Sequence, residues 1–225
     1  MASYFTLTLD TTAPASPIIS LEDGATYASQ QLITATISTG DGATTGYQMK
    51  IWGDVDTTYN ASIQNNEVGS AWITYNTSQQ IKLATTDGNK TIYLKIRDDV
   101  YNASAQASDS IILDTTVAVV SITGPDLSKI SKQTGKNVSS FSFSSDSDFV
   151  EYKVKVVGAT GASEDTGTLI PTTNGSTNTS GTGTYPSSTP VSVQINGADL
   201  ELAASGDGAK IIKVFVKEAN GSWSV

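Results

Sequence analysis

The sequence predicts an all-β chain of two tandem β-sandwich domains, each a Greek-key arrangement of about seven short strands. The letters Leu9-Asp10-Thr11-Thr12 return as Leu113-Asp114-Thr115-Thr116, 104 positions later. A period near 100 residues is about the size of one small sandwich. Thr, Ser, Gly and Asn are abundant, which favours strands and turns over helices. Several short segments also alternate apolar and polar residues, as strands do, so we expect almost no helix.

The repeat places one domain at residues 1–115 and the second at residues 116–225. The two differ most at residues 158–190, where Gly, Ser, Thr, Asn and Pro dominate and only residues 168–171 resemble a strand. A loop of this length inside a compact domain is usually either mobile or used in recognition. Both alternatives stay open for this segment.

Alternation in the first domain is clearest at residues 91–97, where three apolar side chains share one face. The same reasoning predicts strands at residues 18–21, 32–38, 45–52, 71–75, 80–83, 91–97 and 108–113. The expected inward residues are Ile33, Ala35, Ile37, Tyr47, Met49, Ile51, Ile92, Leu94 and Ile96. Seven short strands in about 105 residues suit a Greek-key sandwich.

The second domain repeats this order. Its predicted strands are residues 119–122, 138–143, 150–157, 191–195, 200–202 and 211–217. When the turns Asp87-Gly88 and Asp207-Gly208 are superposed, the inward residues of the strand that follows each turn coincide. One fold is therefore expected twice.

The N-terminal stretch predicts a strand at residues 4–9, because Phe5, Leu7 and Leu9 alternate with polar residues. By the repeat, this strand is the last strand of a sandwich, and the second domain stops before its own last strand. Two alternatives follow. The segment pairs within the first domain, or it completes the second domain of a neighbouring copy and makes a homo-oligomer.

Charge and hydropathy exclude several classes of partner. The net charge is −9, with 13 scattered Lys and Arg, whereas a grip on nucleic acid needs clustered basic residues. An anionic membrane surface is disfavoured for the same reason. No apolar run approaches the roughly 18 to 20 residues that span a bilayer, so we expect no membrane insertion, and no basic signal-peptide region precedes the first strand.

Catalytic chemistry is poorly supported by the residue types. The chain has no Cys and no His, which excludes thiolate nucleophiles, imidazole metal sites and His-dependent triads. Its neighbouring carboxylates occur in turn-like contexts, as at Asp54 and Asp56 or Asp146 and Asp148. We expect neither an enzyme nor a cofactor.

Two sets of residues remain as candidate sites. Asp98, Asp99 and Asp114 offer hard oxygen ligands for Ca²⁺ if they meet at the joint between the domains, and simple turn capping is the alternative. The candidate residues for stacking on glycan rings or contacting a partner are Trp52, Tyr59, Trp72 and Tyr101. Packing in the core is the alternative for these aromatic residues.

The joint between the domains carries a family resemblance. Lys95-Ile96-Arg97-Asp98, then Asn102-Ala103-Ser104, then residues 111–116 resemble the bacterial immunoglobulin-like repeat of surface adhesins and tailed-phage virion proteins. The opening residues 9–14, with the letters LDTTAP, match that repeat fully, whereas Val117-Ala118 replace its Ala-Pro in the second copy. The resemblance implies two immunoglobulin-like sandwiches and says less about function.

Adhesins of this type need an export signal and an anchor, neither of which we expect here, whereas lysis delivers a virion protein. We therefore expect a non-enzymatic structural or adhesion protein located in a tailed-phage virion, in the tail, collar or capsid decoration. Its expected partners are other virion proteins or host cell-surface glycans. The alternatives are a carbohydrate-binding module for host-surface glycans and a fragment of a bacterial surface adhesin, which would be extracellular, on the bacterial cell surface.

Overall fold

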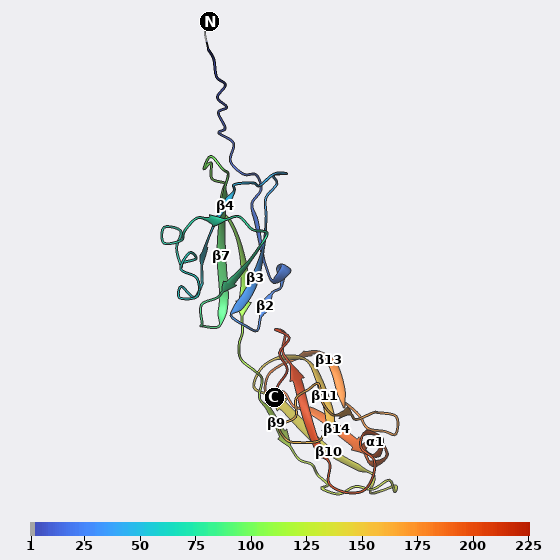
Figure 1. Ribbon diagram of the computed structural model, residues 1–225. Coiled ribbons are helices and arrows are strands. Elements are labelled where there is room, and N and C mark those ends of the chain that lie inside the picture. Colours follow the sequence, from blue (N-terminus) through green and yellow to red (C-terminus); the bar gives the residue numbers. More distant parts are fainter. Residues whose placement is uncertain (1–2) are drawn as a thin grey trace. The chain divides into compact units, whose positions relative to one another are not determined.

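The computed structural model describes residues 3–225, and Met1 and Ala2 lie outside the described residues. The chain divides into two compact units, Met1–Thr115 (unit 1) and Thr116–Val225 (unit 2). Each unit contains mainly antiparallel sheets around its own apolar core (Figure 1). The predicted all-β, sandwich-like class is therefore confirmed, and the immunoglobulin-like assignment stays a prediction.

Unit 1 has two sheets, with strand orders β1-β3-β6 and β2-β8-β7-β4-β5. Its elements are β1 (Ile18–Leu21), η1 (Glu22–Gly24), β2 (Tyr27–Ala28), β3 (Leu32–Ser38), β4 (Gln48–Gly53), β5 (Ile73–Thr74), β6 (Ser78–Lys82), β7 (Gly88–Arg97) and β8 (Ala107–Leu113). All pairings are antiparallel except that of β2 with β8. The predicted strand at residues 45–52 begins later, at Gln48, and residues 71–75 shorten to Ile73–Thr74.

The core of unit 1 is aliphatic and follows the predicted alternation. Met49, Ile51, Leu94 and Ile96 are fully buried, and in the register of β4 with β7 they face one another as Met49↔Ile96 and Ile51↔Leu94. Only Tyr47, expected inward, is partly exposed, because it precedes β4 and its hydroxyl donates a hydrogen bond to Asp41 at 3.2 Å.

Unit 2 has one sheet of order β14-β10-β9 and a second in which β11 pairs with β12, β13 and β15. Its elements are β9 (Val120–Thr123), β10 (Val138–Ser145), β11 (Phe149–Val157), β12 (Thr168–Leu169), β13 (Ser180–Tyr185), β14 (Val191–Asn196), α1 (Gly197–Ala203) and β15 (Ile211–Lys217). Aromatic rings fill part of its core. The rings of Phe149 and Tyr185 stack at 4.8 Å, and Phe143 lies 5.1 Å from Tyr152.

Residues 158–190 are not one long loop, so that expectation needs correction. The strand-like residues 168–171 include β12, as expected, and β13 is an additional strand. Both strands pair with β11, and Ile170 and Thr179 are buried. The strand β13 is hard to predict because its side chains are mostly exposed and small. Its backbone pairs with β11 without needing apolar alternation.

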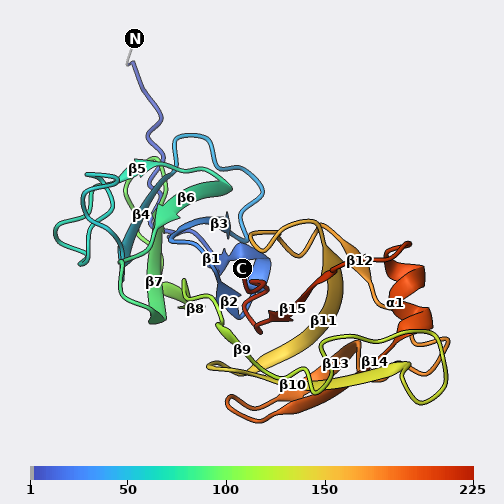
Figure 2. The ribbon, with the colours of Figure 1, turned by 90° about the horizontal axis from the view of Figure 1, so that it is seen from below.

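The strand predicted at residues 200–202 is wrong, because this segment belongs to the helix α1, which directly follows β14 (Figure 2). Asn196 caps the helix through its side-chain oxygen, which accepts a hydrogen bond from the Ala198 N–H at 2.9 Å. The buried Asp199 then accepts hydrogen bonds from Ser176 and Asn174. These polar contacts, rather than apolar alternation, determine the local conformation.

Residues 4–9 form no strand of unit 1, so the alternative in which they pair within the first domain is wrong. Tyr4, Phe5, Leu7 and Leu9 are 84–94% exposed, and this segment belongs to no strand. The edge of β7 is occupied by β8, which lies one repeat later in the sequence. Within the described residues, none of the helices is long and apolar enough to cross a membrane.

Candidate binding surface

The outer face of the larger sheet of unit 1 gathers aromatic and cationic side chains. β4 and β7 alternate, so the residues between the inward-facing core residues point outward. The register places Gln48 opposite Arg97, Lys50 opposite Lys95 and Trp52 opposite Tyr93. Three pairs of large polar or aromatic side chains therefore lie side by side on one face.

Trp52 lies on this face but is covered. It is 6% exposed, its ring stacks on Tyr93 at 5.7 Å, and the Lys95 Nζ lies 5.9 Å from the ring centroid. The neighbouring loop also reaches it, because Gln64 forms a β-bridge with Trp52. Trp52 is therefore covered by its neighbours and offers no exposed ring to a ligand.

Trp72, Tyr101, Arg97 and Lys50 form what we call the aromatic–cationic face. The guanidinium carbon of Arg97 lies 4.4 Å from the Trp72 ring centroid and 4.2 Å from that of Tyr101. The Lys50 Nζ lies 5.1 Å from the same Trp72 ring. Cation–π contacts of this kind are favourable when the cation is partly desolvated, so two cations are held against two aromatic rings.

Arg97 is oriented by the neutral side chain of Gln48. The Arg97 Nε donates a hydrogen bond to the Gln48 Oε1 at 2.8 Å, and the terminal nitrogen donates to the same oxygen. Because Gln48 carries no charge, this contact fixes the guanidinium without neutralising it.

A tight turn after β7 positions Tyr101. The carboxylate of Asp98 accepts hydrogen bonds from the backbone N–H groups of Val100 at 3.0 Å and Asn102 at 2.8 Å. Burial raises the pKa of this carboxyl, but the hydrogen bonds from Asn102 and its neighbours outweigh burial and lower it. Tyr101 itself has a φ of 71° and is 67% exposed, so the turn presents the ring to solvent.

An acidic residue borders the face. The Glu67 carboxylate lies 2.7 Å from the Lys95 Nζ, and the Lys50 Nζ donates a hydrogen bond to the Glu67 carbonyl oxygen at 3.3 Å. These contacts hold the loop between β4 and β5 against the sheet. This loop therefore forms the border of the aromatic–cationic face on the side where Trp52 lies.

Tyr59 does not belong to this face. It is 45% exposed, and its hydroxyl lies 3.5 Å from the Oε1 of Gln80 on β6, a strand of the other sheet. The structure thus brings together Trp52, Trp72 and Tyr101 from the predicted set and separates Tyr59 from them.

The predicted calcium site with three aspartates is wrong. Asp98 and Asp99 follow the end of β7, whereas Asp114 follows the end of β8. These strands are antiparallel, with Leu113 opposite Gly88, so Asp114 lies at the other end of the sheet, about 30 Å away along ten residues of strand. Within residues 3–225, no group of three or more Asp, Glu, His or Cys is placed to hold a metal ion.

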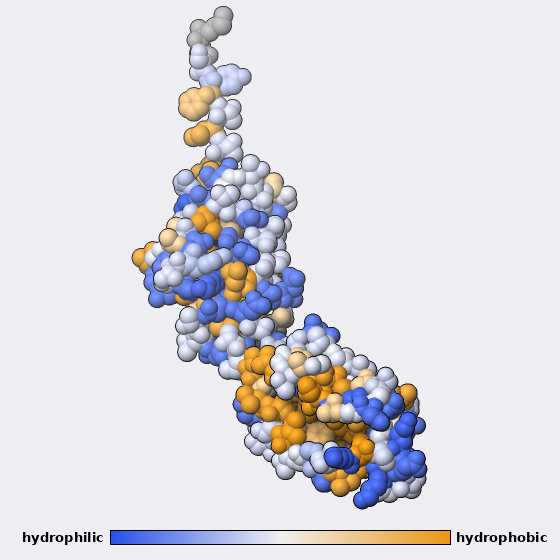
Figure 3. All heavy atoms as spheres, turned by 60° about the horizontal axis from the view of Figure 1, so that its bottom comes forward, coloured by the Kyte–Doolittle hydropathy of each residue, from blue (hydrophilic) through white to orange (hydrophobic). Residues whose placement is uncertain are grey.

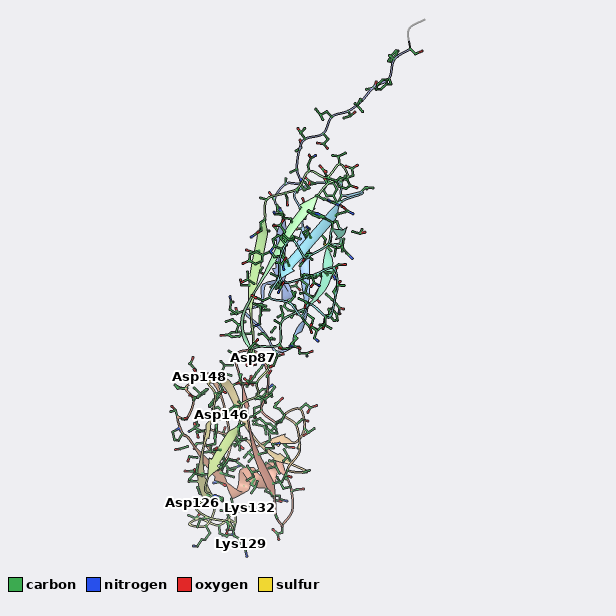
Figure 4. The ribbon with its side chains drawn as sticks, turned by 90° about the vertical axis from the view of Figure 1, so that its left-hand side faces the viewer. Asp87, Asp126, Lys129, Lys132, Asp146 and Asp148 are labelled. Atoms are coloured by element: carbon green, nitrogen blue, oxygen red, sulfur yellow. The ribbon has the colours of Figure 1, made fainter. Side chains whose placement is uncertain are left out.

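The neighbouring carboxylates that the sequence analysis placed in turn-like contexts bind backbone N–H groups or a lysine from other segments of their unit. Asp54 accepts a hydrogen bond from the Thr91 N–H at 2.9 Å, and Asp56 lies 2.9 Å from the Lys82 Nζ. In unit 2, Asp146 and Asp148 accept backbone hydrogen bonds at 2.8 and 2.7 Å. Figure 4 shows both at one end of unit 2, with Asp126, Lys129 and Lys132 at the other.

The sequence reasoning missed Lys50 and Arg97 as parts of the surface. The sequence shows both only as outward residues of strands. The turn after β7 brings Tyr101 to Arg97, whereas Lys50, Arg97 and Trp72 meet through the register of β4 with β7 and with β5. That register follows from pairing between segments far apart in the chain. A local pattern does not contain it.

Comparisons with known proteins add little to this geometry. No protein-family model and no curated protein matches the chain. Among solved structures, the chain is similar to the chitinase ChiA74 from Bacillus thuringiensis, with 14% identity and a TM-score of 0.31. The match covers 92% of this chain and 30% of the chitinase, so the chain spans about a third of that protein's length. A likeness at this TM-score carries no argument about activity.

Proposed function

We propose that the chain is a non-enzymatic structural and adhesion protein of a tailed-phage virion, in which the aromatic–cationic face of unit 1 binds another protein. The observation that carries this proposal is the contact of Arg97 with both Trp72 and Tyr101, at 4.4 and 4.2 Å. Trp, Tyr and Arg are the residue types most enriched among the residues that dominate protein–protein binding energy. Here all three meet beside the larger sheet of unit 1, where Arg97 ends β7, Trp72 precedes β5 and Tyr101 lies in the turn after β7.

The chemistry of the face indicates the kind of partner. The chain as a whole is acidic, with a net charge of −9, yet this face presents the cations of Lys50 and Arg97 against aromatic rings. A partner with acidic and apolar side chains complements it, because carboxylates pair with the guanidinium while apolar groups cover the rings. Other virion proteins are the partners that the resemblance to phage repeats implies.

A binding comparison tests the face. Trp72→Ala and Arg97→Ala should each weaken binding to purified phage particles at least tenfold, because each removes an anchor from the centre of the contact. Tyr59→Ala is the matched control, since Tyr59 is an exposed aromatic residue beside the other sheet. Equal binding by all three variants would contradict a role for this face. Mass spectrometry of purified particles tests the virion location and separates it from a bacterial adhesin.

A carbohydrate-binding function is the second candidate, and the exposure of Tyr101 favours it. A ring that is 67% exposed offers a flat surface to a sugar. Against this, Arg97 already lies over the rings of Tyr101 and Trp72. A glycan array separates the two functions: binding at millimolar sugar that is lost in Tyr101→Ala would support the carbohydrate function, and no binding at that concentration would support the protein partner.

A further inference from the structure

The strand β15 of unit 2 is closed along one edge and open along part of the other. It pairs with β11 over its whole length, from Ile211↔Val157 to Lys217↔Glu151. Among the strands of the described residues, none pairs with its second edge. In unit 1, β7 pairs with β4 on one side and β8 on the other. Open strand edges of this kind readily accept another strand.

The strands β7 and β15 are equivalent, residue by residue. The Ser104 N–H donates to the Ile96 carbonyl at 2.8 Å, and the Ile96 N–H donates to the Ser104 Oγ at 3.0 Å. Ser224 and Val216 repeat both hydrogen bonds at the same distances. These two strands and the turns that follow them therefore correspond with an offset of 120 positions, and the open edge at residues 208–214 corresponds to the part of β7 that β8 covers.

An apolar groove lies beside this open edge. It has a volume of about 660 Å³. Its apolar lining includes Ile122, Phe141, Ile195, Leu200 and Ile212. Figure 3 shows apolar side chains gathered on a face of unit 2. Ile122 belongs to β9 and Ile212 to β15, so the groove lies between the edges of the two sheets.

In unit 1, the strand β8 fills the corresponding space. Its inward residues Ile111 and Leu113 are buried in the core, and the Asp109 carboxylate accepts a hydrogen bond from the Leu21 N–H of β1 at 2.8 Å. One strand thus closes both the edge of β7 and the gap toward β1. Unit 2 has the corresponding gap, which suits a strand with apolar residues at every second position.

Residues 3–9 have these properties. The segment Ser3-Tyr4-Phe5-Thr6-Leu7-Thr8-Leu9 carries no charge, and Phe5, Leu7 and Leu9 are 84–87% exposed. One repeat later in the sequence, the equivalents of Leu7 and Leu9 are Ile111 and Leu113. We propose that residues 3–9 of one copy add to the open edge of β15 in a second copy and fill its groove. The register of β8 on β7 places Thr6 opposite Ile211.

A second copy is required because residues 3–9 are too short to extend along unit 1 to the end at which the chain leaves it. The Asp10 carbonyl accepts a hydrogen bond from the Asn102 Nδ2 at 3.2 Å, at the end of unit 1 where β7 finishes. The Thr115 N–H donates to Asp87 at 3.1 Å, at the end where β7 begins. Seven extended residues span at most about 25 Å, less than the roughly 30 Å of β7. The contact is therefore head-to-tail, which builds an open chain or a closed ring.

Disulfide trapping tests the register. The chain contains no Cys, so Thr6→Cys combined with Ile211→Cys introduces only the designed pair. In unit 1 the equivalent residues Thr91 and Ser110 point to one face, with their hydroxyl oxygens 2.9 Å apart. Mild oxidation should give a ladder of covalent oligomers that a reductant returns to monomer. The control is Tyr59→Cys with Ile211→Cys, which measures random collisions and should give at least tenfold less product.

Self-association of the unmodified chain gives a second measurement. Light scattering during size-exclusion chromatography should show a mass that rises with concentration, and Leu7→Asp should weaken the association roughly 100-fold or more, because it buries a charge. Thr6→Asp, on the outward side, should retain it. A monomer at every concentration, together with no ladder, would overturn the proposal in favour of another occupant of the groove. A disulfide within one chain would overturn it too.

The inference does not rest on the proposed function. None of the residues of the aromatic–cationic face takes part in the strand contact. Loss of self-association in Leu7→Asp with unchanged particle binding would therefore separate the two proposals.

Discussion

Units 1 and 2 share a plan but differ in how they fill and close it. The core of unit 1 is aliphatic, whereas Phe143, Phe149 and Tyr152 contribute to the core of unit 2. The strand β8 closes the edge of β7, whereas the equivalent edge of β15 is open. The two units thus keep the same turns and the same serine hydrogen bonds although their cores are packed with different residue types. The comparison teaches that the edge and the outer face, rather than the core, distinguish what each unit can bind.

The outer faces differ in charge compensation. In unit 2, the Lys153 Nζ lies 4.5 Å from the Trp223 ring and also 2.8 Å from the Glu164 carboxylate. Lys217, which the offset of 120 positions makes equivalent to Arg97, lies 5.7 Å from the same ring and 3.9 Å from the Glu151 carboxylate, whereas Arg97 in unit 1 is held by the neutral Gln48. A carboxylate beside a cation reduces its attraction for an external anion, so unit 1 has the better face for an acidic partner.

The largest expected difference between the units concerns their last strands. Leu113→Ala should destabilise unit 1 by about 3 kcal/mol, since it leaves a cavity beneath β8. Leu9→Ala changes the equivalent residue one repeat earlier and should alter the stability of the monomer by less than about 0.5 kcal/mol, because that side chain is exposed. Urea unfolding followed by hydrogen exchange reports the units separately. Equal effects would show that residues 3–9 already pack within the monomer.

A buried carboxylate should distinguish unit 2 at low pH. Burial raises the pKa of Asp199, but hydrogen bonds from Ser176 and Asn174 outweigh it and hold the pKa at about 2, below the ordinary 3.8. A lowered folded-state pKa stabilises unit 2 above about pH 4 and ceases to do so as the pH falls toward 2. Asp199→Asn should cost about 2 to 3 kcal/mol near neutrality. The cost should shrink at low pH; a pH-independent cost would contradict the ionised state.

The paired serines test whether the units are equivalent. Ser104→Ala and Ser224→Ala each remove a buried oxygen that accepts a backbone N–H at 3.0 Å. Each should cost its own unit about 1 to 2 kcal/mol, because the N–H loses its partner. Local hydrogen exchange at Ile96 and Val216 measures the two losses. Losses of stability that differ by more than about 1 kcal/mol would argue against the equivalence of β7 and β15, on which the strand proposal depends.

The smallest expected effect concerns the two cation–ring contacts. Arg97→Ala should cost unit 1 about 0.5 to 1 kcal/mol, because Arg97 contacts two rings. Lys217→Ala should cost unit 2 less, because Lys153 remains over Trp223 at the shorter distance of 4.5 Å. Thermal unfolding of both variants measures this difference. A larger loss in Lys217→Ala would reverse the assignment of the stronger face to unit 1.

The strands with regular alternation were predictable from the sequence, as at residues 32–38 and 91–97, because a buried face imposes a period of two. The helix α1 and the strand β13 were not. A polar cap stabilises α1 and backbone pairing with β11 stabilises β13. Neither interaction requires an apolar sequence pattern. For the surface, the aromatic residue types indicated Trp72 and Tyr101, but not the cations that lie over them.

The sequence by itself determined the repeat, the all-β class and the inward residues of the longest strands, since these depend on local periodicity and on one motif used twice. Only the tertiary structure decided that Asp98 and Asp114 lie at opposite ends of a sheet, that Arg97 contacts two rings, and that residues 3–9 pair with no strand of unit 1. The reason is physical: strand pairing joins residues distant in the chain, and its register results from competition for edges and cores. The local sequence pattern contains no information about that competition.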